Sequence, residues 1–174
     1  TRCINSIWKR SVSSGGIMKQ KVYKPKQLQS VSFDQFKSFL DSLDEENETW
    51  SLNLQDYKDE KDFYENEGEW CIVWLEYDKI ISLIHAYTTH QKIAEVSRVV
   101  KKEYQRKGFG TEMLLSMEDL LKDINYNKIC SKQYIDNIAS YKSCLKAGYK
   151  VVKEDTSKNL RWLTKEIWWV KYKF

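Results

Sequence analysis

Residues 93–113 read IAEVSRVVKKEYQRKGFGTEM, and their periodicity changes at a pair of glycines. Before the glycines, the β-branched residues predict a strand over about 92–100. After them, five apolar residues between 113 and 121 recur at helical spacing, which predicts a helix from Thr111. The chain therefore contains a strand, a glycine loop and a helix in direct succession.

The loop at 105–111 has the features of a phosphate-binding site. Gly108 and Gly110 permit close backbone approach, and the N-terminus of the following helix directs unpaired N–H groups into the loop. Residues 98–108 contain five basic residues and one glutamate, a charge that favours a polyanion. The loop lacks both the Gly-Lys-Ser/Thr of a Walker A sequence and the third glycine of a dinucleotide fingerprint. A glycine turn with a solvated basic face is the alternative interpretation.

The other predicted elements are mixed in type and show no internal repeat. Ser32 and Gln35 form a capping box at the start of a helix over 33–43. The later elements are strands at 70–75 and 80–86, a strand at 128–135, a helix at 137–147 that ends at Gly148, and a hairpin of 149–154 and 166–172. We therefore predict a mixed α/β fold with antiparallel hairpins near both ends.

The composition fits one soluble globular domain. The 174 residues are 41% apolar, with a formal net charge of +4, and 24 aromatic side chains against one proline argue against disorder. No apolar run reaches the ~18 residues that a membrane span needs. The four cysteines, at irregular spacings, support neither a disulfide scaffold nor a zinc site. We expect a cytoplasmic protein without membrane or metal, with one domain over 18–174 and a flexible extension at 1–17.

Two motifs carry a family resemblance. Gln105, Gly108 and Gly110 match the Gln/Arg-x-x-Gly-x-Gly/Ala loop of the GNAT superfamily of N-acetyltransferases. The later pattern of that family, an Asn followed eleven and twelve residues on by a Gly–aromatic pair, is present as Asn137 and residues 148–149. The chain therefore resembles a GNAT acetyltransferase.

The resemblance covers residues 18–174 in element order and is most specific over 93–149. It implies a central, mostly antiparallel, twisted sheet of six to seven strands, splayed between the fourth and fifth strands, with about four helices. Acetyl-CoA would fill the splay, its pyrophosphate held by the backbone amides of 106–111. The cofactor-binding residues implied by the resemblance are Arg98, Val99, Val100, Gln105, Arg106, Lys107, Gly108, Phe109, Gly110, Thr111, Asn137 and Ser140.

The implied reaction is direct attack of a primary amine on the thioester of acetyl-CoA, which needs a base to remove a proton. Glu95 is the carboxylate nearest to the family's base position, with a solvated strand charge as the alternative role, and His85 is a weaker candidate. Many family members place a Tyr proton donor seven residues after the Asn, but here that residue is Cys144. Tyr141, one turn earlier on the same helix face, is the other candidate. Either residue could instead pack in the core.

The acceptor is suggested by charge. Residues 41–69 carry twelve carboxylates and two lysines, and this acidic belt favours a small cationic amine, polyamine-like or aminoglycoside-like. A protein lysine or N-terminal amine, and a CoA-binding GNAT domain without turnover, are the alternatives. The same belt argues against a nucleic-acid partner. Trp168, Trp169 and Tyr172 leave open a contact within a homodimer.

Overall fold

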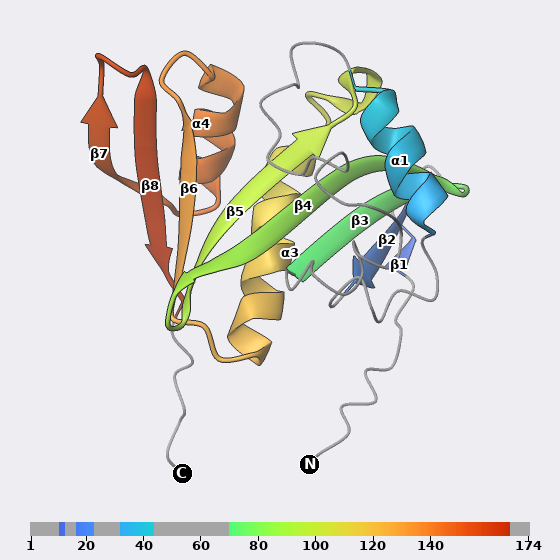
Figure 1. Ribbon diagram of the computed structural model, residues 1–174, viewed down its shortest axis with the longest axis horizontal. Coiled ribbons are helices and arrows are strands. Elements are labelled where there is room, and N and C mark those ends of the chain that lie inside the picture. Colours follow the sequence, from blue (N-terminus) through green and yellow to red (C-terminus); the bar gives the residue numbers. More distant parts are fainter. Residues whose placement is uncertain (1–10, 13–16, 23–31, 44–69, 168–174) are drawn as a thin grey trace.

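The structure is a computed structural model, and it describes residues 11–12, 17–22, 32–43 and 70–167. Its strands form one eight-stranded sheet in the order β1-β2-β3-β4-β5-β6-β8-β7 (Figure 1). The strands are β1 (Ser11–Val12), β2 (Ile17–Val22), β3 (Trp70–Glu76), β4 (Lys79–His90), β5 (Ile93–Val100), β6 (Lys128–Tyr134), β7 (Lys150–Asp155) and β8 (Leu160–Glu166). The helices are α1 (Phe33–Asp41), α3 (Phe109–Asp123) and α4 (Ile138–Lys146), with a 3-10 helix at Lys102–Tyr104.

All neighbouring strands pair antiparallel except β5 and β6, which are parallel. The predicted mixed α/β fold with a mostly antiparallel sheet is therefore confirmed. The sheet has eight strands where six or seven were expected, and the described residues contain three α-helices where about four were expected. None of these helices is long and apolar enough to cross a membrane.

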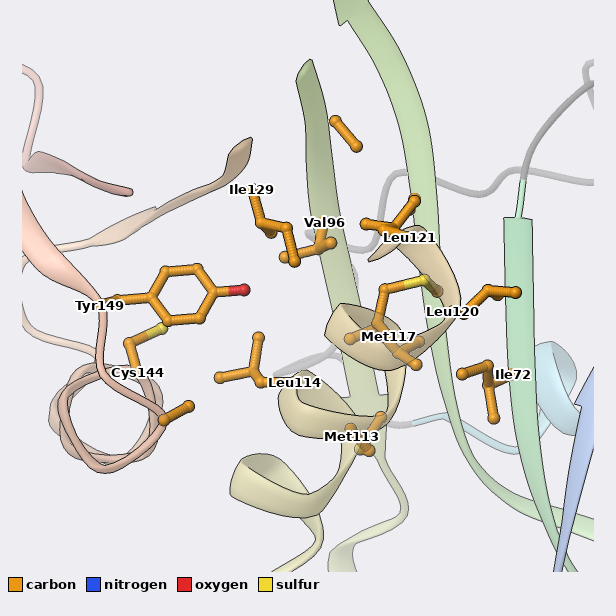
Figure 2. Close-up of a cluster of buried hydrophobic side chains, with 14 of the residues drawn as sticks. Ile72, Val96, Met113, Leu114, Met117, Leu120, Leu121, Ile129, Cys144 and Tyr149 are labelled. Carbon is orange, nitrogen blue, oxygen red and sulfur yellow. The ribbon is translucent and has the colours of Figure 1, made fainter. Parts of the chain in front are cut away.

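Helices cover both faces of the sheet (Figure 1). On one face, Phe36 and Phe39 of α1 are buried against Leu83 of β4 and Val99 of β5. The other face carries the larger apolar cluster, built from α3, α4 and the strands. Figure 2 shows this cluster, with Leu114 of α3 directed toward α4, which carries Cys144. The burial of both faces fixes which side chains of β5 point toward which helix.

Local signals set the helix ends. The predicted capping box before α1 is confirmed, because Gln35 N donates to Ser32 Oγ (3.2 Å) and Ser32 N donates to Gln35 Oε1 (2.6 Å). Gly148, just beyond α4, has a φ of +88°, as expected for a glycine that ends a helix. Both helices therefore begin or end where the sequence predicts.

The C-terminal hairpin differs from its prediction. We expected its second strand at 166–172, but β8 spans Leu160–Glu166. The turn forms earlier because Asp155 Oδ1 accepts hydrogen bonds from Ser157 Oγ (2.6 Å) and Lys158 N (3.2 Å), and Asn159 follows with a φ of +54°. The segments 44–69 and 168–174, with the acidic belt beyond residue 43 and the three C-terminal aromatic residues, lie outside the described residues.

The sheet also reaches into the segment that we expected to lie outside the fold. Ser11 and Val12 pair with Lys19 and Met18 of β2, and Ile17 pairs with Glu76 of β3. The edge of a sheet offers unpaired N–H and C=O groups, which even a two-residue strand can satisfy. The expectation that residues 1–17 lie outside the fold is therefore wrong at these three positions.

Candidate functional site

Strands β5 and β6 pair over only four residue pairs, the last of which is Val96–Ser131. Beyond that pair, β5 continues to Val100 beside β4, whereas β6 continues to Tyr134 beside β8. The two strands diverge toward the end of β5 that leads into the glycine loop (Figure 1). This is the predicted splay, between the fourth and fifth strands when the strands are counted from β2.

Backbone groups of β5 face this splay at alternate residues. The N–H of Lys101 donates to Ile81 O of β4 at 2.9 Å. Successive N–H groups along a strand point to opposite sides. The backbone of Val99 therefore faces β4, whereas the backbones of Arg98 and Val100 face the side on which β6 diverges. Among the β5 residues predicted to bind a cofactor, Arg98 and Val100 are favoured over Val99 for backbone contacts.

The two glycines of the loop have different physical roles. Gly108 caps α3 with a φ of +89°, and a Cβ there would meet no heavy atom within 4 Å, so the backbone conformation requires the glycine. At Gly110 a Cβ would lie 3.1 Å from Ser143 Oγ, so this glycine lets α3 approach α4. The helix begins at Phe109, two residues before the prediction, and the Phe109 side chain is buried in the core. Phe109 can therefore offer a ligand only its backbone.

The start of α3 is open to an anion. Gly108 provides no side-chain cap, so the first N–H groups of the helix keep their hydrogen-bonding capacity. Arg106 and Lys107 are exposed beside them, and Thr111 is half-buried in the first turn. Unpaired N–H groups, the positive end of the helix dipole and two nearby cations together suit a phosphate group.

Side chains hold the loop in place. Gln105 Nε2 donates to Val100 O at 3.1 Å, tying the loop back to β5. The Tyr104 hydroxyl hydrogen-bonds the Glu76 carboxylate, and Lys107 Nζ lies 4.9 Å from the centroid of the Tyr104 ring. The hydrogen bond to Glu76, followed by burial, raises the pKa of Tyr104 to about 12. The loop is therefore positioned before any ligand binds.

The predicted stripe on α4 divides between two neighbours. Ser140 and Cys144 lie beside Arg98, whose Nη2 is 3.0 Å from Ser140 Oγ and 3.6 Å from Cys144 Sγ. Tyr141 instead stacks on Arg161 of β8, with the guanidinium carbon 3.9 Å from its ring centroid. Asn137 caps the helix, its Oδ1 accepting from Ser140 N at 3.1 Å. Cys144 is fully buried, so the structure gives it a packing role whether or not it has a chemical one.

The predicted base lies on the opposite face of β5. Glu95 alternates with Val96, so its side chain is on the α1 face of the sheet, half-buried, with Tyr87 of β4 and Cys130 of β6 as cross-strand neighbours. His85 is buried on the same face, its ring centroid 6.0 Å from that of Tyr87. Burial raises the pKa of the Cys130 thiol, and the nearby Glu95 carboxylate raises it further. This face can therefore offer a carboxylate and a histidine to an amine.

Sequence reasoning missed two residues at the site. Ser143 of α4 contacts both glycine-loop and strand residues, since its Oγ accepts from Arg98 Nη2 at 2.7 Å and limits the space at Gly110. Gln133 of β6 is buried beside Cys144, whose Sγ lies 4.0 Å from Gln133 Oε1. A polar residue in phase with Ile129 and Ser131 on a strand was the available signal for Gln133.

The comparisons with known proteins agree with this geometry. The model of the acetyltransferase (GNAT) family matches residues 36–149. A GNAT acetyltransferase structure from Streptococcus pneumoniae is similar with a TM-score of 0.68 and 12% identity, over 87% of this chain and 99% of that one. A ribosomal-protein alanine N-acetyltransferase from Escherichia coli has a TM-score of 0.62 and 13% identity, over 91% of this chain and 98% of that one.

A third structure is a GNAT phosphinothricin acetyltransferase from Sinorhizobium meliloti in complex with acetyl-CoA. It has a TM-score of 0.51 and 12% identity, over 57% of this chain and 62% of that one. At such identities the three structures support the fold alone, and no curated protein matches the sequence. The family model spans well over half of the chain and includes the glycine loop, the splay and the Gly–aromatic pair. The chain belongs to the acetyltransferase (GNAT) family.

Proposed function

We propose that this chain transfers the acetyl group of acetyl-CoA to a primary amine. The observation that carries the proposal is the parting of β5 and β6 after Val96–Ser131, which opens toward the loop that leads to the left-handed helix start at Gly108. Unpaired strand edges can accept an extended, amide-bearing chain, and an uncapped helix N-terminus can accept its phosphates. The similar structure from Sinorhizobium meliloti contains acetyl-CoA, which agrees with this assignment.

Each part of the site would hold a different part of the cofactor. The N–H groups of Phe109, Gly110 and Thr111 would bind the diphosphate, with Arg106 and Lys107 supplying positive charge. The backbones of Arg98 and Val100 would bind the pantetheine arm. From the other side of the splay, Asn137 and Ser140 would approach the same arm, as the sequence resemblance implies. When bound, acetyl-CoA supplies an acetyl group that is activated as a thioester.

Glu95 would act as the base. An alkyl amine with a pKa near ~10 is mostly protonated at neutral pH, so a carboxylate must accept its proton directly or through a water. Glu95 is half-buried on the α1 face of β5, the strand that borders the splay. Its carboxylate is therefore near the splay, on the face of the sheet from which we expect the amine to approach. Tyr141, which stacks on Arg161, and Cys144, which is fully buried, remain the predicted proton donors.

The acceptor that we favour is a small cationic amine, polyamine-like or aminoglycoside-like. The support is the concentration of carboxylates in residues 41–69, which would attract a polycation. Relatives in fold include both a small-molecule acetyltransferase and a ribosomal-protein alanine acetyltransferase by name. A protein N-terminus or lysine is therefore the second candidate acceptor.

Two measurements test the proposal. Thermal unfolding with CoA at about 100 times its Kd should show a stabilisation of about 2.7 kcal/mol, because the ligand binds only the folded chain. Thiol release from acetyl-CoA should then be followed with a linear polyamine, an aminoglycoside, and peptides bearing an N-terminal alanine or an internal lysine. Stabilisation without release on any amine would favour a CoA-binding domain, an outcome that the replacement of the family's Tyr by Cys144 makes worth testing. No stabilisation would overturn the proposal.

A further inference from the structure

Arg98 and Gln133 occupy equivalent positions on the two strands that border the splay. The last pair of β5 and β6 is Val96–Ser131, and each of these residues lies two positions beyond it. Side chains two residues apart share a face of the sheet, and both side chains reach Cys144 of α4. Arg98 Nη2 is 3.6 Å and Gln133 Oε1 is 4.0 Å from Cys144 Sγ. Both side chains therefore lie beside Cys144, where the splay begins to open.

The guanidinium of Arg98 has only uncharged partners in the described part of the chain. Its Nη2 donates to Ser143 Oγ (2.7 Å), Ser140 Oγ (3.0 Å) and Ser140 O (3.1 Å). No carboxylate among residues 11–12, 17–22, 32–43 and 70–167 forms an ion pair with it. A partly buried cation that no described carboxylate neutralises stabilises negative charge that develops nearby.

Gln133 contributes a hydrogen-bond donor that has no partner in the described structure. The residue is only 7% exposed, and its Nε2 is buried without a hydrogen bond, while Oε1 faces the Cys144 thiol. The orientation of the carboxamide follows from Cys144, whose sulfur accepts from Arg98 Nη2 and whose thiol donates to Gln133 Oε1, so that Nε2 is the end without a partner among the described residues. A buried donor without an acceptor is costly to a folded protein, so such a group is expected to serve a ligand.

The direction of the cofactor, as given by the proposed function on which this inference rests, decides which ligand atom lies here. With the diphosphate at Gly108, the arm would run along β5 from Val100 toward Val96, a distance of about 13 Å at ~3.3 Å per residue. The end of the arm that lies nearest to the closure of the splay is the end that bears sulfur. The sulfur would therefore lie near the first open positions, which are Arg98 and Gln133.

We propose that Gln133 Nε2 donates a hydrogen bond to the thioester sulfur of acetyl-CoA, with the Arg98 guanidinium supporting the negative charge. The amine nitrogen forms a bond to the acetyl carbon, the carbon–sulfur bond breaks, and its electron pair stays on sulfur. The amine proton goes to the base, and Gln133 keeps its own proton. These two donors thus stand in for the Tyr that the resemblance places at position 144, where this chain has a cysteine.

Tyr149 provides a matched control. Its hydroxyl is also buried without a hydrogen-bond partner among the described residues, and burial raises the pKa of Tyr149 well above its usual value, so that it stays neutral. Figure 2 shows its ring directed toward Leu114, among apolar residues that include Val96 and Ile129. Removing this hydroxyl therefore removes a polar atom from the apolar cluster on the α3 face of the sheet. Tyr149→Phe should leave sulfur chemistry unchanged.

The test compares Gln133→Leu with Tyr149→Phe. The first readout is the pKa of the CoA thiol in the complex, followed by thiolate absorbance in the ultraviolet. In the complex with wild type, the CoA thiol should have a lower pKa than CoA in solution. In the complex with Gln133→Leu this pKa should be closer to the solution value, and in the complex with Tyr149→Phe it should equal the wild-type value. The second readout is the affinity for CoA and for desulfo-CoA. Desulfo-CoA lacks the sulfur, so only the binding of CoA can be weakened by loss of the contact to Gln133. At a pH above the thiol pKa, the preference for CoA over desulfo-CoA should fall roughly tenfold in Gln133→Leu.

Stability separates this role from a packing role. Gln133→Leu removes a buried donor that lacks a partner, so it should unfold at the same temperature as wild type or higher, while kcat falls roughly tenfold and KM for acetyl-CoA stays constant. If Gln133→Leu does not fold, Gln133→Met takes its place, and the side-chain amide resonance of Gln133 in wild type should shift with CoA but not with desulfo-CoA. An equal thiol pKa in wild type and variant, or an equal amide shift with both ligands, overturns the inference alone. Failure of wild type to bind either ligand overturns the proposed function as well.

Discussion

Strand β5 presents two chemically different faces. Toward α3 and α4 it carries Arg98, which is held by hydrogen bonds to Ser140 and Ser143. Toward α1 it carries Glu95, whose cross-strand neighbours are Tyr87 and Cys130. The first face is cationic and close to the open helix N-terminus, and the second offers a carboxylate.

This difference shows how one strand can separate anion binding from proton transfer. Because side chains alternate along a strand, residues only three positions apart can contact different ligands on opposite sides of the sheet. Within β5, substitution of Arg98 should then lower cofactor affinity, whereas substitution of Glu95 should lower turnover. The comparison is broken if either kind of substitution changes both quantities equally.

The largest effect is expected at Gly108. Gly108→Asp places a carboxylate at the open start of α3, where it should repel phosphate, and we expect at least a roughly 100-fold loss of CoA affinity. The measurement is a CoA titration followed by thermal unfolding. Gly108→Ala is the control, because it introduces the same left-handed strain, about 1–2 kcal/mol, without the charge.

The two Gly108 variants give distinguishable outcomes. Gly108→Ala should lower stability yet bind CoA within about tenfold of wild type, because space around its Cβ is open. Equal losses of affinity in both variants would assign the effect to the backbone conformation. Retained CoA binding in Gly108→Asp would contradict the assignment of the phosphate site.

The next largest effect is expected at Glu95, on the α1 face of β5. Glu95→Gln should lower kcat by roughly 100-fold, because general-base catalysis typically contributes at least that much, while KM for acetyl-CoA changes little. Asp119→Asn, which removes an exposed carboxylate from α3, serves as the control and should leave kcat unchanged. If Glu95→Gln retains wild-type kcat on every accepted amine, Glu95 is a solvated strand charge and not the base.

Substitution of Arg98 tests the hydrogen bonds that join β5, on one side of the splay, to α4 on the other side. Arg98→Met keeps the aliphatic stem but removes three hydrogen bonds to α4, and we expect a loss of about 2 kcal/mol in the free energy of unfolding, measured in urea. CoA affinity should fall as well, because α4 loses its tie to β5. Lys142→Met, on the exposed surface of the same helix, should change neither quantity by a comparable amount.

Short-range signals predicted the parts of the site that depend on a few neighbouring residues. The capping box at Ser32, the helix end at Gly148 and the glycine loop are each set by local hydrogen bonds or by φ. The C-terminal hairpin differs from its prediction because the hydrogen bonds of the turn at residues 155–159 decide where the second strand begins, whereas aromatic residues alone do not locate a turn.

The long-range contacts were beyond what the sequence alone could predict. Arg98 meets Ser140, Ser143 and Cys144, which are at least 42 residues away in the chain. Their meeting depends on the register of β5 against β6 and on how closely α4 packs against Gly110. Side-chain periodicity gives the face of each residue but not the element that covers that face, so Gln133 could be assigned to the site only from the three-dimensional arrangement.

The smallest effect concerns the support of the glycine loop rather than either face of β5. Tyr104→Phe removes the hydroxyl that hydrogen-bonds Glu76, and the expected loss of stability at pH 7 is about 1 kcal/mol.

The effect should depend on pH, because this hydrogen bond raises the pKa of Tyr104 from 10.0 to about 12 in the folded chain. A group whose folded pKa is raised stabilises fully below its unfolded pKa, and that contribution is lost as pH rises through the folded pKa. The stability difference between wild type and Tyr104→Phe should therefore be constant below pH 10.0 and shrink between pH 10.0 and about 12. Taking the difference between the two proteins removes the similar contribution of Tyr149, which both contain. A difference that stays constant over that range would show that Tyr104 ionises independently of Glu76, and the loop would then be held mainly by the Gln105 contact to Val100.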